Sequence, residues 1–111
     1  MSGFFAGIDG GQSSTIAAIG DDAGREIARG IAGPADEIAQ GPDSTRLRDA
    51  LRDALAAACS NAGLAPDVVF EAIVAGVSGY EGRVYGAAPD LPARSFTLGH
   101  DAPIAHAGAL A

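Results

Sequence analysis

A short stretch near the N-terminus combines the residue types that hold phosphate and a hard cation. It reads Ile8-Asp9-Gly10-Gly11-Gln12-Ser13-Ser14-Thr15 and lies between two apolar runs. Gly10 and Gly11 permit a sharp turn whose bared N–H groups suit an anion, and the hydroxyls that follow add donors. The carboxylate of Asp9 could hold the magnesium that accompanies a nucleotide. The same residue types also make an ordinary hairpin turn, so the stretch alone leaves both interpretations open.

Composition excludes several classes of function. The chain has 111 residues, which fits one domain, and a net charge of −7 with 5% aromatic residues. This acidic, aromatic-poor composition argues against nucleic-acid binding, which needs a basic face or stacking platforms. No stretch is long and apolar enough to cross a membrane, and the N-terminus lacks the pattern of a signal peptide. We therefore expect a soluble cytoplasmic protein.

The single cysteine, Cys59, allows neither an internal disulfide nor a zinc cluster. It lies beside the apolar stripe of a predicted helix. A free cysteine in such a position is usually a small buried residue rather than a reactive thiol, and that is the expectation here.

Three strands are predicted over residues 3–8, 15–20 and 25–31. The first is apolar almost throughout, as in a strand buried on both faces. Short turns rich in Gly, Asp and Ser separate the three, which predicts an antiparallel meander. The following loop, 32–43, carries two Gly-Pro pairs that break regular structure.

The clearest helix is predicted over 44–62. Asp43 or Ser44 is expected to cap its start, and Gly63 suits the position just after its end. Its apolar face recurs at three- and four-residue spacing and consists of Leu47, Leu51, Ala54, Leu55, Ala58 and Ala62.

The second half of the chain predicts two more strands. Residues 68–77 are almost continuously apolar, which suits a central parallel strand. Residues 83–92 could hold a short helix, although two prolines shorten it. A last strand is expected over 95–98, and a helix begins near Ala102, with Pro103 in its first turn.

The predicted order is therefore β-β-β-α-β-α-β-α, an α/β fold. A meander followed by βαβ units gives a mixed five-stranded sheet with helices on both faces. Ligands gather at the carboxyl ends of the parallel strands in such sheets. Three polar loops, 9–14, 78–82 and 99–101, are expected to meet at that edge. Their convergence favours a binding site over an ordinary hairpin turn.

Four segments together carry a resemblance to a known family. Residues 7–15 resemble a first phosphate motif, 32–36 the loop after the third strand, 74–79 a strand with its substrate loop, and 100–102 a segment with a catalytic aspartate. The chain thus resembles the N-terminal domain of the sugar-kinase, heat-shock-protein and actin superfamily, which is ribonuclease-H-like and forms one lobe of an actin-like ATPase. Within it, the chain looks most like the BadF/BadG/BcrA/BcrD ATPases, which include N-acetylglucosamine kinases.

The resemblance implies an ATP- and magnesium-dependent sugar kinase whose small sugar acceptor is N-acetylglucosamine- or glucosamine-like. Asp101 would be the general base that takes the proton from the attacking hydroxyl, and Asp9 would hold magnesium. The implied cofactor-binding residues are Asp9, Gly10, Gly11, Gln12, Ser13 and Thr15. The implied substrate-binding residues are Asp36, Ser78 and Gly79.

The sequence departs from the family pattern in three places. Ser14 stands at the position of a lysine in the usual Gly-Thr-Lys-Thr, and Asp36 and His100 stand where asparagine is common. Asp36 could still accept a hydrogen bond from a sugar hydroxyl, but the amide donor of asparagine is lost. These departures leave the acceptor sugar open.

Family members also have a second domain with another phosphate loop and the adenosine pocket. Residues 1–111 are therefore expected to be an N-terminal domain, inactive alone, whose partner is the missing C-terminal domain. Two other functions stay open: an activator ATPase with an iron–sulfur cluster at a dimer interface, and a non-catalytic sugar- or nucleotide-binding or assembly module. Self-association into a homodimer would cover the surface meant for the second domain.

Overall fold

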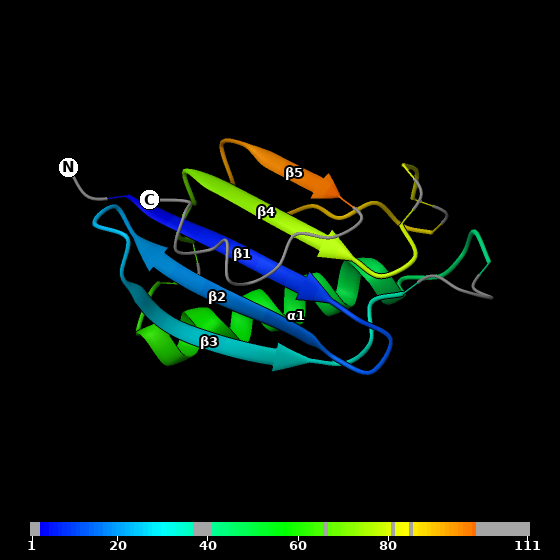
Figure 1. The fold of residues 1–111 in the computed structure, drawn as a ribbon, viewed down its shortest axis with the longest axis horizontal. Coiled ribbons are helices and arrows are strands. Elements are labelled where there is room, and N and C mark those ends of the chain that lie inside the picture. The colour runs from blue at the N-terminus through cyan, green and yellow to red at the C-terminus, as the bar shows by residue number, and fades with distance from the viewer. Residues whose placement is uncertain (1–2, 37–40, 66, 81, 85, 100–111) are drawn as a thin grey trace.

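A computed structural model describes residues 3–36, 41–65, 67–80, 82–84 and 86–99. Five strands form one sheet in the order β3-β2-β1-β4-β5, and one helix, α1, lies against it (Figure 1). The elements are β1 (Phe4–Gly10), β2 (Thr15–Asp21), β3 (Glu26–Ala32), α1 (Arg46–Ala62), β4 (Ala72–Val77) and β5 (Phe96–Gly99).

The sheet is mixed, as the sequence predicts. β2 runs antiparallel to β1 and to β3, whereas β4 is parallel to both β1 and β5. Ile8 at the centre of the sheet pairs with Ala17 of β2 on one side and with Ala75 of β4 on the other. The arrowheads of β1, β3, β4 and β5 consequently point to the same end of the molecule in Figure 1. We call this end the carboxyl edge of the sheet.

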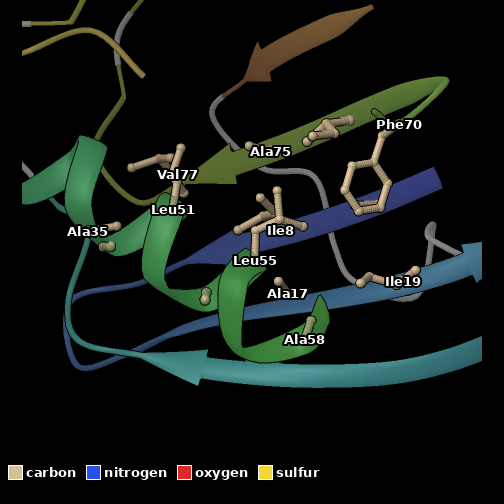
Figure 2. Packing of buried hydrophobic residues seen from close by; sticks show 14 of the residues in the cluster. Ile8, Ala17, Ile19, Ala35, Leu51, Leu55, Ala58, Phe70, Ala75 and Val77 are labelled. Atoms are coloured by element: carbon tan, nitrogen blue, oxygen red, sulfur yellow. The ribbon is translucent and has the colours of Figure 1, made fainter. Parts of the chain in front are cut away.

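The core lies between α1 and one face of the sheet (Figure 2). Strand residues that face the helix alternate with residues on the opposite face, as the pleat requires. Small residues dominate this core, so the helix can approach the sheet closely. The strands contribute Ala6, Ile8, Ala17, Ile19, Ile73, Ala75 and Val77, and the helix contributes Leu47, Ala50, Leu51, Ala54, Leu55 and Ala58.

The helix crosses β3 at Gly30. A Cβ atom built on Gly30 would lie 2.2 Å from the backbone nitrogen of Ala58 and 2.4 Å from the carbonyl oxygen of Ala54. Real Cβ atoms do not approach backbone atoms so closely, so only glycine fits there. The same face of the helix carries alanine at both positions, and the two elements are in backbone contact.

The helix ends as predicted and begins later than predicted. Gly63 adopts the left-handed conformation, with φ of 71°, and the N–H of Leu64 donates to the carbonyl of Cys59 at 3.0 Å, the usual way of closing a helix. The N-cap position belongs to Thr45 rather than to Asp43 or Ser44. The Ser44 hydroxyl nevertheless accepts the N–H of Arg46 at 3.2 Å. Over the described residues, no helix is long and apolar enough to span a bilayer.

The prediction of a short helix within 83–92 is wrong. The described residues of that segment form bends and irregular chain, without a helical turn. Pro89 and Pro92 lack the N–H that a helical hydrogen bond needs, and Gly86 disfavours a helix. The segment packs over the core instead, with Val84 and Leu91 partly buried against it.

The strand predicted over 68–77 is shorter, because regular pairing starts at Ala72. Phe70 makes only an isolated parallel bridge with Ala93 and is fully buried. The helix predicted from Ala102 and the catalytic candidate Asp101 lie outside the described residues. In the part of the chain that is described, α1 covers one face of the sheet. The prediction of helices on both faces is therefore confirmed for one face only.

Candidate functional site

Gly10 and Gly11 join three loops at the carboxyl edge. The N–H of Gly11 donates to the carbonyl of Ser14 at 2.8 Å and closes the turn between β1 and β2. The carbonyl of Gly11 accepts the N–H of Ala35, in the loop after β3, at 3.0 Å. The carbonyl of Gly10 accepts the N–H of Ser78, after β4, at 2.8 Å. Of the loops predicted to meet at this edge, 9–14 and 78–82 are thus bonded to each other, and the loop after β3 joins them.

The lack of a side chain at Gly10 makes this junction possible. A Cβ atom there would lie 2.8 Å from the Cβ of Ala35 and 3.5 Å from a methyl group of Val77. Figure 2 shows Ala35 and Val77 together at one end of the core, with Phe70 and Ile19 toward the other. The loop after β3 is therefore packed directly on the end of β1.

Replacing Gly10 with alanine is expected to push Ala35 off the strand and to break its hydrogen bond to Gly11. Overpacking of this kind costs about 1–3 kcal/mol, which chemical denaturation of the two proteins measures. The double variant Gly10→Ala/Ala35→Gly removes the opposing methyl group and should recover most of the loss. Equal stability of the single and double variants would contradict the close contact.

Asp9 and the tip of the turn are open to solvent. Asp9 is the penultimate residue of β1, exposed, and pairs with Ile16 and Gly76. Because Ile8 faces α1, the Asp9 carboxylate projects from the opposite face of the sheet. Gln12 and Ser13 are exposed at the tip, and their N–H groups have no hydrogen-bond partner in the described part of the chain. The geometry fits an anion at the tip and a cation near the carboxylate.

Thr15 has a different place from the one that the resemblance implies. Its side chain is fully buried, and its hydroxyl donates to the carbonyl of Gly33 at 2.8 Å. The hydroxyl thus ties the first residue of β2 to the loop after β3. Thr15 supports the position of the turn, while the donors that reach solvent are those of Gln12 and Ser13.

Asp36, next to Ala35, is buried with an exposed fraction of 6%. The Nη2 atom of Arg46 lies 3.2 Å from its Oδ1 atom. This is an ion-pair distance, but the orientation does not make a hydrogen bond, since Asp36 Oδ1 and Arg46 Nε are both without a hydrogen-bond partner. The carboxylate predicted to receive a sugar hydroxyl is therefore adjacent to the junction of the loops, with its Oδ1 atom buried from solvent.

Arg46 is not among the site residues predicted from the sequence. One signal could have found it: Arg46 is the first residue of α1, where the helix dipole disfavours a cation. A carboxylate close to this arginine would offset the unfavourable interaction of its charge with the helix dipole. In the first turn of α1, the hydrogen bond from the Thr45 side chain, followed by the contact with Arg48, lowers the pKa of the Asp49 carboxyl.

Ser78 and Gly79 form the turn after β4. Both are exposed, and the N–H of Tyr80 donates to the carbonyl of Val77 at 3.2 Å to close the turn. Gly99, the last described residue, pairs with Gly76 and ends β5 at the same edge. Asp101 follows two residues later and lies outside the described residues.

Cys59 lies far from this edge, in the last turns of α1. It is partly buried, as expected, and burial raises the pKa of its thiol. It borders a mostly apolar cavity of about 400 Å³ with Leu55, Leu64 and Phe70. Among the described residues, no three His, Cys, Asp or Glu side chains are arranged to hold a metal ion.

No protein-family model and no curated protein sequence matches the chain. Among solved structures, the chain is similar to a "Putative N-acetylglucosamine Kinase" from Chromobacterium violaceum, with 25% sequence identity and a TM-score of 0.67. The similarity covers 87% of this chain and 34% of that one, so the chain spans about a third of the length of the protein it matches. The mixed five-stranded sheet, its strand order and this match agree with the resemblance found in the sequence: the chain has an N-acetylglucosamine-kinase-like fold of the ribonuclease-H-like, actin-like ATPase class.

Proposed function

We propose that the chain is the N-terminal lobe of an ATP-dependent sugar kinase whose acceptor is N-acetylglucosamine- or glucosamine-like. The observation that carries this proposal is the junction at Gly10–Gly11, where three polar loops are bonded together at the carboxyl edge of the sheet. Open α/β sheets bind their ligands at this edge. The similarity to the Chromobacterium violaceum protein supports the same reading.

In this proposal the turn between β1 and β2 receives the terminal phosphates of ATP. The unpartnered N–H groups of Gln12 and Ser13, with the Ser13 hydroxyl, are the donors that reach the phosphate oxygens. The exposed carboxylate of Asp9 holds magnesium through its water ligands. Magnesium supplies positive charge that offsets the charge of the phosphates.

The acceptor sugar would lie between the loops after β3 and β4, against Asp36, Ser78 and Gly79. Asp101 takes the proton from the sugar hydroxyl as its oxygen bonds to the terminal phosphorus, and the bond from that phosphorus to ADP breaks. The remaining phosphate contacts and the adenosine pocket belong to a second lobe. Closure of the two lobes would exclude water, so this lobe alone is expected to be inactive.

Calorimetric titration of magnesium–ATP tests the nucleotide half of the proposal. The protein is expressed from the full coding sequence that contains this chain. Asp9→Asn is expected to weaken magnesium-dependent binding about 10- to 100-fold, the usual effect of losing an outer-shell metal contact. Asp22→Asn is the matched control, since Asp22 is an exposed aspartate in the turn between β2 and β3. Equal affinities of the two variants would overturn the role of Asp9.

A further inference from the structure

The turn between β1 and β2 is bonded to the first residues of the loop after β3, which lies beside it in Figure 1. Thr15, the first residue of β2, pairs with Ala32, the last residue of β3. The Thr15 hydroxyl donates to the carbonyl of Gly33 at 2.8 Å. The N–H of Ala35 then donates to the carbonyl of Gly11 at 3.0 Å. Two hydrogen bonds therefore hold residues 33–35 on the turn.

The hydroxyl of Thr15 serves this attachment and no ligand. Thr15 is fully buried, so its side chain cannot touch a bound molecule in this structure. A buried carbonyl or hydroxyl that loses its partner is costly, and the bond therefore keeps the loop in one position relative to the turn. Serine at position 15 would keep the donor, whereas valine, which is similar in size, would remove it.

The bond from Ala35 fixes the direction of one proposed phosphate donor. In a trans peptide unit the C=O and the N–H point in opposite directions. The C=O of Gly11 points to Ala35, so the N–H of Gln12, in the same peptide unit, points away from the loop. The N–H of Gly11 is also held, because it donates to the carbonyl of Ser14 at 2.8 Å. The loop after β3 thus helps to set the direction of the Gln12 N–H.

Glycine at position 11 makes this direction depend on the loop. A glycine backbone has wide conformational freedom, and the bond from Ala35 restricts it here. A ligand that orders the loop would therefore also order the Gln12 N–H. In turn, a phosphate bound by that N–H would favour the peptide orientation that accepts Ala35. Each ligand would lower the cost in conformational entropy of binding the other.

We infer that Thr15 is a positioning residue that couples the binding of the ATP phosphates at the turn to the binding of the acceptor beside the loop after β3. This inference rests on the proposed function. It assigns to Thr15 no contact with either ligand, and it adds a linkage between the two sites that runs through Gly33, Ala35 and the Gly11–Gln12 peptide unit.

Calorimetry of the protein expressed from the full coding sequence measures this linkage. The affinity for magnesium with a non-hydrolysable ATP analogue is determined with and without saturating N-acetylglucosamine. In the wild type the sugar should tighten binding of the analogue about 5- to 150-fold, the usual size of coupling between two sites. In Thr15→Val this ratio should fall by about 5-fold or more, and in Thr15→Ser it should stay close to the wild-type value.

Thr97→Val is the matched control, since Thr97 is an exposed threonine in β5. It should keep the wild-type ratio. The ratio also separates coupling from a purely structural role. A Thr15→Val protein that is less stable and binds each ligand more weakly, but keeps the wild-type ratio, would overturn the inference.

Hydrogen exchange of the wild type gives a second measurement, which stays decisive if Thr15→Val does not fold. N-acetylglucosamine alone should slow exchange of the Gly11 N–H, in the turn, by about 5-fold or more, as expected for coupled sites. Unchanged exchange of the Gly11 N–H would contradict the linkage. A wild type that binds neither the analogue nor the sugar would overturn the proposed function, whereas independent binding of both would overturn this inference alone.

Discussion

Replacing Gly30 with alanine is expected to destabilise the chain by about 3 kcal/mol, the upper end of the usual cost of overpacking, or to prevent its folding. The added methyl carbon would lie 2.2 Å from the backbone nitrogen of Ala58 and 2.4 Å from the carbonyl oxygen of Ala54. Backbone atoms of a helix cannot move aside as a flexible side chain can. α1 would have to lift off β3, and the small core between them would open.

Urea denaturation followed by circular dichroism measures this loss. Gly33→Ala is the matched control, because a Cβ atom at Gly33 meets nothing within 4 Å. The control should unfold at nearly the same urea concentration as the wild type. A Gly30→Ala protein as stable as Gly33→Ala would contradict the contact between α1 and β3.

A displacement of α1 from β3 should also disturb the candidate site, because each of the two elements is followed or begun by a residue of that site. β3 precedes the loop that carries Asp36, and α1 begins at Arg46. The ion pair between these residues spans the two elements. A soluble Gly30→Ala protein should therefore bind sugar more weakly than its remaining secondary structure would suggest.

Asp101→Asn is expected to lower sugar phosphorylation about 10²- to 10⁴-fold, the usual contribution of a general base. Asparagine keeps the shape of the side chain but cannot take the proton of the attacking hydroxyl. Binding of magnesium–ATP should be unchanged, because the proposed phosphate turn lies on a different loop. Turnover with N-acetylglucosamine and calorimetry with magnesium–ATP measure the two properties separately.

Asp90→Asn is the control for this variant, an exposed aspartate in the described loop before β5. It should phosphorylate sugar at the wild-type rate. Full turnover by Asp101→Asn would rule out its role as the base. Loss of nucleotide binding in Asp101→Asn would instead indicate a structural role for this side chain.

Much of the fold could be predicted because its signals are local. The apolar run before Asp9, the Gly-containing turns and the spacing of Leu47, Leu51 and Leu55 each specify an element within a few residues. The meander and the parallel position of β4 follow from the order of those elements and from the handedness of crossovers. The observed strand order β3-β2-β1-β4-β5 agrees with this reasoning.

The details of the site could not be predicted, because they depend on contacts between distant residues. The hydroxyl of Thr15 is a plausible phosphate donor by sequence, yet it binds Gly33, 18 residues away. The requirement for glycine at Gly10 comes from the Cβ of Ala35 in another loop. The ion pair of Arg46 with Asp36 joins the start of α1 to the loop after β3, and the sequence does not show that these two residues meet. Periodicity and turn signals contain no information on such pairings.

The segment after β4 was mispredicted for a related reason. Small and apolar residues within 83–92 are compatible with a short helix, but Pro89 and Pro92 remove donors at its end. The segment gains more by packing Val84 and Leu91 on the core than by forming one turn. Burial of these two side chains on the core outweighs the weak preference of the segment for a helical turn.

Coupled measurement of ADP release and sugar phosphate formation tests the central claim most directly. The protein expressed from the full coding sequence is mixed with ATP, magnesium and N-acetylglucosamine or glucosamine. A kinase with this lobe should release ADP and form sugar phosphate in equal amounts, only when magnesium and a sugar are both present. ATP hydrolysis that proceeds at the same rate without any sugar, or no ADP release with any hexose or hexosamine, would contradict a sugar kinase.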